Sequence, residues 1–212
     1  MLTVRSFIFN AFGVNTYVLY DESRECIIID PACQEPDEED ELAGFIEANE
    51  LKPVRLVNTH MHIDHILGNE FISEKYNLLP EVHADAIVFL GTASQAAAAY
   101  DLRIGKIISP AKFLKDGDIL KCGNSSLGVL FTPGHAAGSI CLVCHADSFV
   151  ITGDVLFQES IGRTDLPTGD LNQLLTSIRQ KLFTLPDSFK VYPGHGPATS
   201  IGFERRNNPF IS

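Results

Sequence analysis

The apolar positions of the chain fall into short runs separated by polar turns, and the first of these runs predict strands. One of them contains the β-branched run Ile27–Ile29, a composition that favours strands. The acidic stretch Glu35–Glu41 then begins a helix that continues to about Asn49, because acidic side chains suit the positive end of a helix dipole. The strands expected in this first segment cover residues 2–9, 15–20 and 25–30.

The rest of the chain continues as further strands and helices. Strands are expected over residues 54–58, 81–83, 127–132, 140–144, 148–152 and 190–192. Helices are expected over residues 66–76, 84–99 and 171–182. No low-complexity linker divides the chain, and both halves run from strands into helices. We therefore predict an α+β fold in a single domain spanning residues 1–212, with two β-sheets packed face to face and helices outside.

Composition and charge narrow the class of protein. The 212 residues are 45% hydrophobic and 20% charged, as in a soluble globular protein. The formal net charge of −11 disfavours binding to a nucleic-acid backbone. The amino terminus lacks the features of a signal peptide, and no apolar stretch is long enough to span a bilayer. We expect a cytoplasmic protein with no nucleic-acid partner and no membrane partner; nothing in the chain predicts its oligomeric state.

The cysteines form one motif that needs an interpretation. There are five, and in a chain expected to be cytoplasmic they are predicted to be free thiols. Cys141 and Cys144 form a C-x-x-C pair inside an apolar run that predicts a strand. Residues three apart on a strand point to opposite faces of the sheet. We therefore expect buried core thiols rather than a zinc or redox site.

The distribution of the histidines carries the functional signal. Of the seven, three lie within the six residues 60–65, with an aspartate among them. His135, Asp154 and His195 each have a glycine neighbour, and each follows a predicted strand, as the 60–65 segment does. Loops that leave the same edge of a sheet structure converge, and functional residues favour such loops. Isolated core or capping histidines would not give this pattern, whereas His83 and His145 stand alone and are interpreted as structural or surface histidines.

These residue types in this spacing predict two adjacent metal sites. Neutral imidazole and carboxylate are ligands that suit zinc and other first-row divalent metals. An extended segment can place His60 and His62 on one side, and the following turn can aim Asp64 and His65 at a second position ~3.5–4 Å from the first. The predicted ligands are His60, His62 and His135 for the first metal, and Asp64, His65 and His195 for the second, with Asp154 bridging both.

The same motifs resemble those of the metallo-β-lactamase superfamily over nearly the whole chain. The H-x-H-x-D-H motif of that family corresponds to residues within Thr59–Ile66. The further motifs are T-P-G-H at 132–135, T-G-D at 152–154 and Y-P-G-H-G at 192–196. The resemblance implies a four-layer αβ/βα sandwich, the metallo-β-lactamase fold, with two mixed β-sheets and the metals at one edge. It implies the same division of the seven ligands.

Within that superfamily the chain resembles the short glyoxalase II (hydroxyacylglutathione hydrolase)-like branch. Asp154 stands where the best-known zinc β-lactamases carry a cysteine, which argues against lactam hydrolysis. The segment Ser160–Pro167, with its G-R-T-D, and the ending 194–210 are similar to that branch. Full-length glyoxalase II has a carboxyl-terminal helical domain that grips glutathione, and its residues have no counterpart here. The resemblance implies hydrolysis of hydroxyacylglutathione or a related acyl-thioester, with the thiol carrier left open.

The mechanism expected from this resemblance is attack by a hydroxide that bridges two divalent metals, zinc first, with iron or manganese as alternatives. Two such ions contribute +4, and Asp64, Asp154 and the hydroxide remove three, so a site of about +1 favours a small anionic acyl-thioester. Asp64 is the catalytic candidate, because it can orient the hydroxide. Arg163 either binds a substrate carboxylate or forms a structural salt bridge. Tyr100 and Lys106 lie in a region that borders the expected cleft.

The main alternative is a persulfide dioxygenase with a single iron. Such enzymes share the H-x-H-x-D-H and G-R-T-D segments, although the continuation Leu166–Asp170 is more similar to the short hydrolases. Nucleic-acid processing, which other branches perform, is disfavoured by the acidic balance of the chain. A metal-binding module without catalysis is disfavoured by the intact ligand set.

Overall fold

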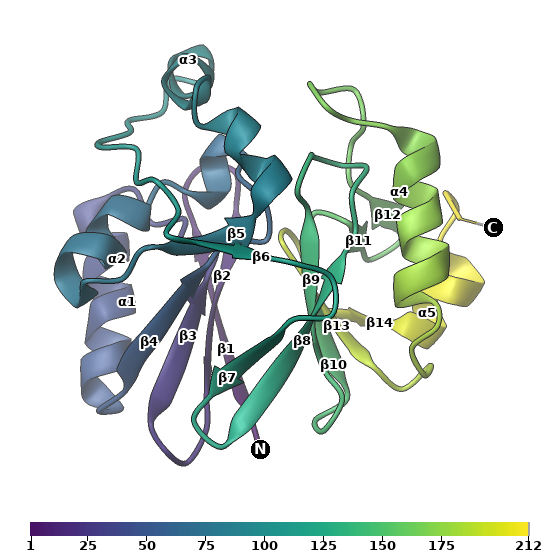
Figure 1. Cartoon of the computed structure of the whole chain (residues 1–212), viewed down its shortest axis with the longest axis horizontal. Coiled ribbons are helices and arrows are strands. Elements are labelled where there is room, and N and C mark those ends of the chain that lie inside the picture. The colour runs from purple at the N-terminus through teal and green to yellow at the C-terminus, as the bar shows by residue number, and fades with distance from the viewer. Residues whose placement is uncertain (212) are drawn as a thin grey trace.

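Two six-stranded sheets pack against each other, and helices cover the outer face of each sheet (Figure 1). The structure is a computed structural model that describes residues 1–211. Helices α1 and α2 lie outside the first sheet, and α4 and α5 lie outside the second. The α+β sandwich of two mixed sheets with helices outside is therefore confirmed. The helices are α1 (Pro36–Ala48), α2 (Asn69–Tyr76), α3 (Ala93–Ala99), α4 (Leu171–Ser177) and α5 (Ile201–Asn207).

The first sheet contains the strands of the amino-terminal half in chain order. β1 to β3 pair antiparallel, and β3 to β6 pair parallel. The parallel strands all end at the same edge of the sheet, which brings the loops after them together. The strands are β1 (Thr3–Phe9), β2 (Val14–Tyr20), β3 (Glu25–Ile29), β4 (Lys52–Val57), β5 (Pro80–His83) and β6 (Lys112–Leu114).

The second sheet has the order β14-β13-β10-β9-β8-β7. Only β10 and β13 pair parallel, and the other neighbours are antiparallel. Strands β8, β10 and β13 therefore run in the same direction. Its strands are β7 (Ile119–Cys122), β8 (Ser125–Phe131), β9 (Ile140–Cys144), β10 (Phe149–Gly153), β13 (Lys190–Pro193) and β14 (Thr199–Ser200). A separate hairpin is formed by β11 (Leu156–Phe157) and β12 (Ser160–Ile161).

The apolar core has a layer between the sheets and one under each set of helices. Leu19 and Ile29 of the first sheet pack with Leu142 of the second in the central layer. Cys144 belongs to that layer, whereas Cys141 packs in the layer under α4. The two cysteines therefore face opposite sides of β9, as predicted. All five cysteines are buried, and none is paired within residues 1–211.

Several predicted boundaries differ from the structure. The predicted helix over 84–99 is a 3-10 helix, Ala84–Phe89, followed by a turn and then α3. Gly91 lies in that turn, and glycine is a poor helix former. The segment after His65 becomes helical only at Asn69. Elements β6, β7, β11, β12, β14 and α5 were not predicted. None of the helices within the described chain is long and apolar enough to cross a bilayer.

Candidate metal centre

The structure brings the seven predicted ligands together at one edge of the sandwich. They lie just beyond the carboxyl ends of four strands, β4 in the first sheet and β8, β10 and β13 in the second. Hydrogen bonds join the two sheets at this edge, because Ile140 N donates to Thr59 O at 2.8 Å and Asn15 N donates to Gly194 O at 2.7 Å. The ligand-bearing loops of both sheets are therefore held to each other.

The first group consists of three histidines, His60, His62 and His135, whose ring nitrogens lie within 4.8 Å of one another. His62 Nδ1 and His135 Nε2 are 2.9 Å apart. His60 Nε2 is buried and has no hydrogen-bond partner. A buried polar atom without a hydrogen-bond partner lowers the stability of the fold. A metal ion bound among the three imidazoles would give this nitrogen a partner.

The second group consists of Asp64, His65 and His195. His65 Nε2 and His195 Nε2 are 3.3 Å apart, and Asp64 Oδ2 lies 3.4 Å from His195 Nε2. Asp64 and His65 both belong to the 3-10 helix Ile63–His65. This tight turn directly after the His60–His62 segment is the reason one loop serves both groups.

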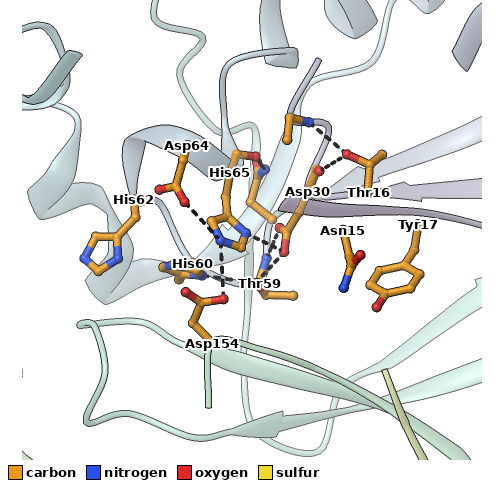
Figure 2. Close-up of polar contacts among 12 residues, drawn as sticks. Asn15, Thr16, Tyr17, Asp30, Thr59, His60, His62, Asp64, His65 and Asp154 are labelled. Atoms are coloured by element: carbon orange, nitrogen blue, oxygen red, sulfur yellow. Dashed lines mark hydrogen bonds and ion pairs between the residues drawn. The ribbon is translucent and has the colours of Figure 1, made fainter. Parts of the chain in front are cut away.

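Asp154 lies between the two groups. One carboxylate oxygen, Oδ2, is 3.6 Å from His135 Nε2 and 3.4 Å from His195 Nε2. The other, Oδ1, is 3.4 Å from His65 Nε2, and it is buried without a hydrogen-bond partner. Figure 2 shows the Asp154 carboxylate below the ring of His65, whose other ring nitrogen faces Asp30. The position is the one a bridging ligand requires.

The donor atoms fit divalent metal ions. Tetrahedral zinc with metal–ligand distances of ~2.0–2.1 Å has its donor atoms about 3.4 Å apart. The separations of 3.3 and 3.4 Å in the second group agree with this spacing. Two buried donor atoms without partners, His60 Nε2 and Asp154 Oδ1, point to the same conclusion. The residues present therefore suit zinc or another first-row divalent metal at both positions.

Second contacts fix the histidine rings, so that one nitrogen of each remains directed at the site. His65 Nδ1 is 3.1 Å from Asp30 Oδ2, and His135 Nδ1 donates to Arg163 O at 2.8 Å. His195 Nδ1 donates to Phe12 O at 3.0 Å. Such outer partners set the tautomer and the orientation of metal-binding histidines.

Asp30 is a site residue that was not predicted. It is 1% exposed and accepts hydrogen bonds from Thr59 N at 2.7 Å and Thr59 Oγ1 at 2.6 Å, in addition to its contact with His65 (Figure 2). The available signal was its position directly after the apolar run Ile27–Ile29, because the predicted ligands also follow strands. Asp30 holds the loop after β4 and the ring of His65 in one arrangement.

We expect Asp30→Asn to lower metal affinity about 10–100-fold without unfolding the protein, since that is the usual effect of removing an outer carboxylate. Thr59 N contacts Oδ1 of Asp30, whereas the Thr59 hydroxyl and His65 share Oδ2, so the single oxygen of asparagine cannot serve both sides. Chelator competition on purified protein measures the change. Asp21→Asn is the matched control: Asp21 is also buried and accepts from Ser125 Oγ, but it lies in the turn after β2, away from the site. Unchanged affinity in Asp30→Asn would contradict this role.

The surroundings of the ligands favour neutral imidazole in the first group and positive charge beside the carboxylates of the second. Burial lowers the pKa of His60 well below its usual range and lowers that of His62 to about 4. Burial disfavours the charge on His195, but its hydrogen bonds to Asp154 and Asp64 outweigh this and raise its pKa to about 9. Burial likewise opposes ionisation of Asp154, yet the charge on His65 holds its pKa well below the usual range. The first group is neutral imidazole, and the carboxylates are ionised.

The site opens into a cavity of about 770 Å³. Arg163 lines the cavity, but its side chain makes two 2.7 Å hydrogen bonds to Asp165. The structure thus contains a salt bridge of Arg163, and the binding of a substrate carboxylate by Arg163 stays a prediction. Tyr100 lines the cavity, whereas Lys106 is exposed and does not. The ligands that line it are His62, Asp64, His135, Asp154 and His195.

Two residues near the end of the chain, Glu204 and Asn208, hold a hairpin whose residues line the cavity. Glu204 is fully buried and accepts from Glu159 N at 2.9 Å, and Asn208 Nδ2 donates to Ser160 O at 3.0 Å. Asn208 Nδ2 also donates to Glu204 Oε2 at 2.8 Å. These bonds hold the β11–β12 hairpin, whose second strand begins at Ser160 and leads to Arg163. The motif at the chain's end thus has a structural role.

The two isolated histidines lie outside both groups of ligands. His83 stacks on Phe131 with ring centroids 4.1 Å apart, and its Nδ1 accepts from Asp85 N. His145 is exposed and contacts the ring of Phe189. Neither has a place in the metal centre.

Comparison with known proteins gives relatives that match the chain almost end to end. A family model described as the metallo-beta-lactamase superfamily matches residues 9–195. The probable metallo-hydrolase YqgX of Bacillus subtilis is 38% identical over 199 residues, which cover 93% of this chain and 92% of the relative. The hydroxyacylglutathione hydrolase GloC of Haemophilus influenzae is 34% identical over 204 residues, covering 95% and 94% respectively.

Solved structures match equally well. TTHA1623 in a di-iron-bound form superposes with a TM-score of 0.88 at 32% identity, covering 98% of this chain and all of that one. The BLEG-1 B3 metallo-beta-lactamase gives 0.89 at 30% identity, covering 99% and 100%. ETHE1 from Myxococcus xanthus gives 0.79 at 29% identity, covering 98% and 83%. The chain is thus similar both to a metallo-beta-lactamase and to a hydroxyacylglutathione hydrolase.

Proposed function

The chain belongs to the metallo-β-lactamase superfamily, and from this premise we propose that it is a two-metal hydrolase of acyl-thioesters, similar to glyoxalase II. The observation that carries the proposal is the pair of adjacent ligand groups with Asp154 between them, open to one cavity. Family membership supports a metal-dependent hydrolase. The side chains around the cavity support a thioester as the substrate.

The ligands divide as the geometry groups them. When bound, the metals, for which we propose zinc, would supply a water of lowered pKa as the nucleophile and would polarise the carbonyl of the substrate. The di-iron neighbour makes iron the first alternative. The first metal would be held by His60, His62 and His135, the second by Asp64, His65 and His195, and Asp154 would contact both.

Asp64 is the residue we propose to orient the nucleophile. Burial opposes its ionisation, but the charge on the neighbouring His65 outweighs it and keeps the pKa of Asp64 below its ordinary value. Its carboxylate lines the cavity, and Asn10 Nδ2 fixes its backbone by donating to Asp64 O at 3.0 Å. An ionised carboxylate that is held in place can accept a hydrogen bond or a proton from the attacking water. It thereby orients the lone pair of the water toward the carbonyl carbon.

The remaining cavity side chains favour a thioester over an amide. Apart from the ligands, the only titratable side chains among those that the structure describes around the cavity are Tyr100 and Arg163. An amide nitrogen must be protonated to leave, whereas a thiolate, with a pKa of about 8.5, leaves unassisted near neutral pH. A cavity with few acids is therefore suited to thioesters, and the 34% identity to the hydroxyacylglutathione hydrolase GloC supports the same class.

A single-iron oxygenase, the alternative from the sequence, needs only one of the two ligand groups. Both groups are present here, but such oxygenases share the H-x-H-x-D-H segment that contributes to both of them. The number and identity of the bound metals, together with the reaction catalysed, therefore distinguish the two functions.

We expect protein purified without chelator to contain about two metal ions per chain and to hydrolyse acyl-thioesters. Elemental analysis gives the first result, and thiol release from a panel of thioesters gives the second. One iron per chain together with oxygen consumption on a persulfide would replace the proposal with the oxygenase. Two metals per chain without hydrolysis of any thioester would leave the centre but refute the substrate class.

A further inference from the structure

The walls of the cavity beyond the metal ligands are mostly apolar. On one side they are formed by the 3-10 helix Ala84–Phe89 and by α3, which contribute Val88, Phe89 and Ala96. On the other side the β11–β12 hairpin and the loop after it contribute Ile161 and Leu166. The polar side chains on these walls are Thr92, Gln95, Tyr100, Ser160, Arg163 and Thr168. The cavity therefore offers a substrate mainly apolar contact.

Aromatic rings continue this wall up to the metal ligands. The ring of Phe89 lies 5.0 Å from that of His62, edge to face, and Phe157 lies 6.1 Å from His195. Phe12, in the turn between β1 and β2, meets Tyr100 edge to face at 5.5 Å. Both ligand groups thus border aromatic surface.

The cavity provides no free positive charge for a charged substrate tail. Arg163 is the only lysine or arginine among the described residues that line it, and both of its bonded nitrogens already face the Asp165 carboxylate. A carboxylate on the thiol part of a substrate would have to replace Asp165 at Arg163 or lose hydration without gaining a partner, and neither adds much to binding. Glutathione carries two such carboxylates, so its thioesters fit the cavity poorly.

We propose that the cavity selects uncharged thioesters with an apolar acyl group of several carbons. The inference rests on the proposed thioesterase function and refines it. Only the carbonyl oxygen needs the positive charge of the metals, and the rest of the substrate contacts Val88, Phe89 and the opposite wall. The cavity volume of about 770 Å³ lies within the range that encloses a substrate of drug size. This substrate differs from the small anionic one that the charge of the metals predicts, and the experiment below distinguishes the two.

Chain length is the direct test. With N-acetylcysteamine as the neutral thiol, kcat/KM is expected to rise roughly fourfold for each buried methylene. The hexanoyl thioester should therefore exceed the acetyl thioester at least tenfold, and it should exceed lactoylglutathione. If lactoylglutathione is the better substrate, the inference is wrong and the thioesterase stands. If no thioester is hydrolysed by fully metallated protein, the thioesterase itself is refuted.

A pair of neighbouring variants locates the effect in the wall. Val88 is 53% exposed and lines the cavity, whereas Ile87 is 47% exposed and does not. Val88→Lys places a charge on the acyl surface and is expected to lower kcat/KM for the hexanoyl thioester about tenfold, with little change for acetyl. Ile87→Lys adds the same charge one residue away and should leave both within twofold. Equal effects of the two variants, or equal losses on both substrates, would overturn the assignment.

Discussion

Asp154→Asn is expected to lower thioesterase kcat/KM by a factor on the order of 10³ and to reduce bound metal to one ion or fewer per chain. Asp154 is the residue whose two oxygens approach both ligand groups, at 3.4 Å from His65 and 3.6 Å from His135. Asparagine keeps the size but loses the charge, and its amide nitrogen cannot bind a cation. Breaking a buried charged contact costs about 3–5 kcal/mol, which corresponds to the expected factor.

Elemental analysis and thioester kinetics on the same preparation measure the two effects together. Asp21→Asn again provides the control, because it makes the same change in a buried aspartate that touches neither group. Circular dichroism spectra should show that both variants are folded. Retention of two metals by Asp154→Asn would show that the carboxylate is not a bridge. The proposed assignment of the seven ligands to two metals would then be wrong.

Much of this centre was predictable because its signal is local. Three histidines and an aspartate within residues 60–65 need only one turn to serve two positions, and the 3-10 helix Ile63–His65 supplies that turn. His135, Asp154 and His195 could be added because each follows an apolar strand. Strands that run in the same direction bring such positions to one edge regardless of the details of packing.

The residues that were missed depend on contacts between distant segments. Asp30 resembles any polar residue at the end of a strand, and its role comes from its bonds to Thr59 and His65, about thirty residues away. The Glu204 contact with the β11–β12 hairpin spans 45 residues. Short strands such as β12, with two residues, carry too little periodic signal to be recognised.

The apolar character of the cavity also could not be predicted from the sequence. Val88 and Phe89 were assigned to a helix, in which apolar residues usually pack into a core, but the break at Gly91 leaves Val88 exposed beside the site. The charge of the metals predicted an anionic substrate, because metal charge can be counted from the ligands alone. The pairing of Arg163 with Asp165 and the apolar wall are tertiary features that such a count does not include.

Gly194→Ala is expected to lower activity about 10²-fold and to weaken metal binding, although glycine 194 itself binds nothing in the site. A methyl group at this position would overlap Asp154 Oδ1 and lie 2.9 Å from His65 Cε1. The Gly194 backbone is held because Gly194 N donates to Gly153 O at 2.8 Å, and Asp30 holds the ring of His65, so the Asp154 carboxylate is the group that moves. The added carbon therefore displaces the bridging carboxylate, and displacements of about 1 Å are enough for such a loss.

Gly196→Ala separates this displacement from a general disturbance of the loop. Gly196 has a positive φ of +72°, and nothing lies within 4 Å of the position a methyl would take. Alanine there strains the backbone by about 1 kcal/mol and should lower Tm by roughly 2–4 °C, with metal content and kcat/KM nearly unchanged. Gly194→Ala should show the opposite balance, with a small change in Tm of the metal-free protein and a large loss of metal and activity. Similar activity losses in both variants would mean that loop strain, rather than the space beside Asp154, requires glycine at position 194.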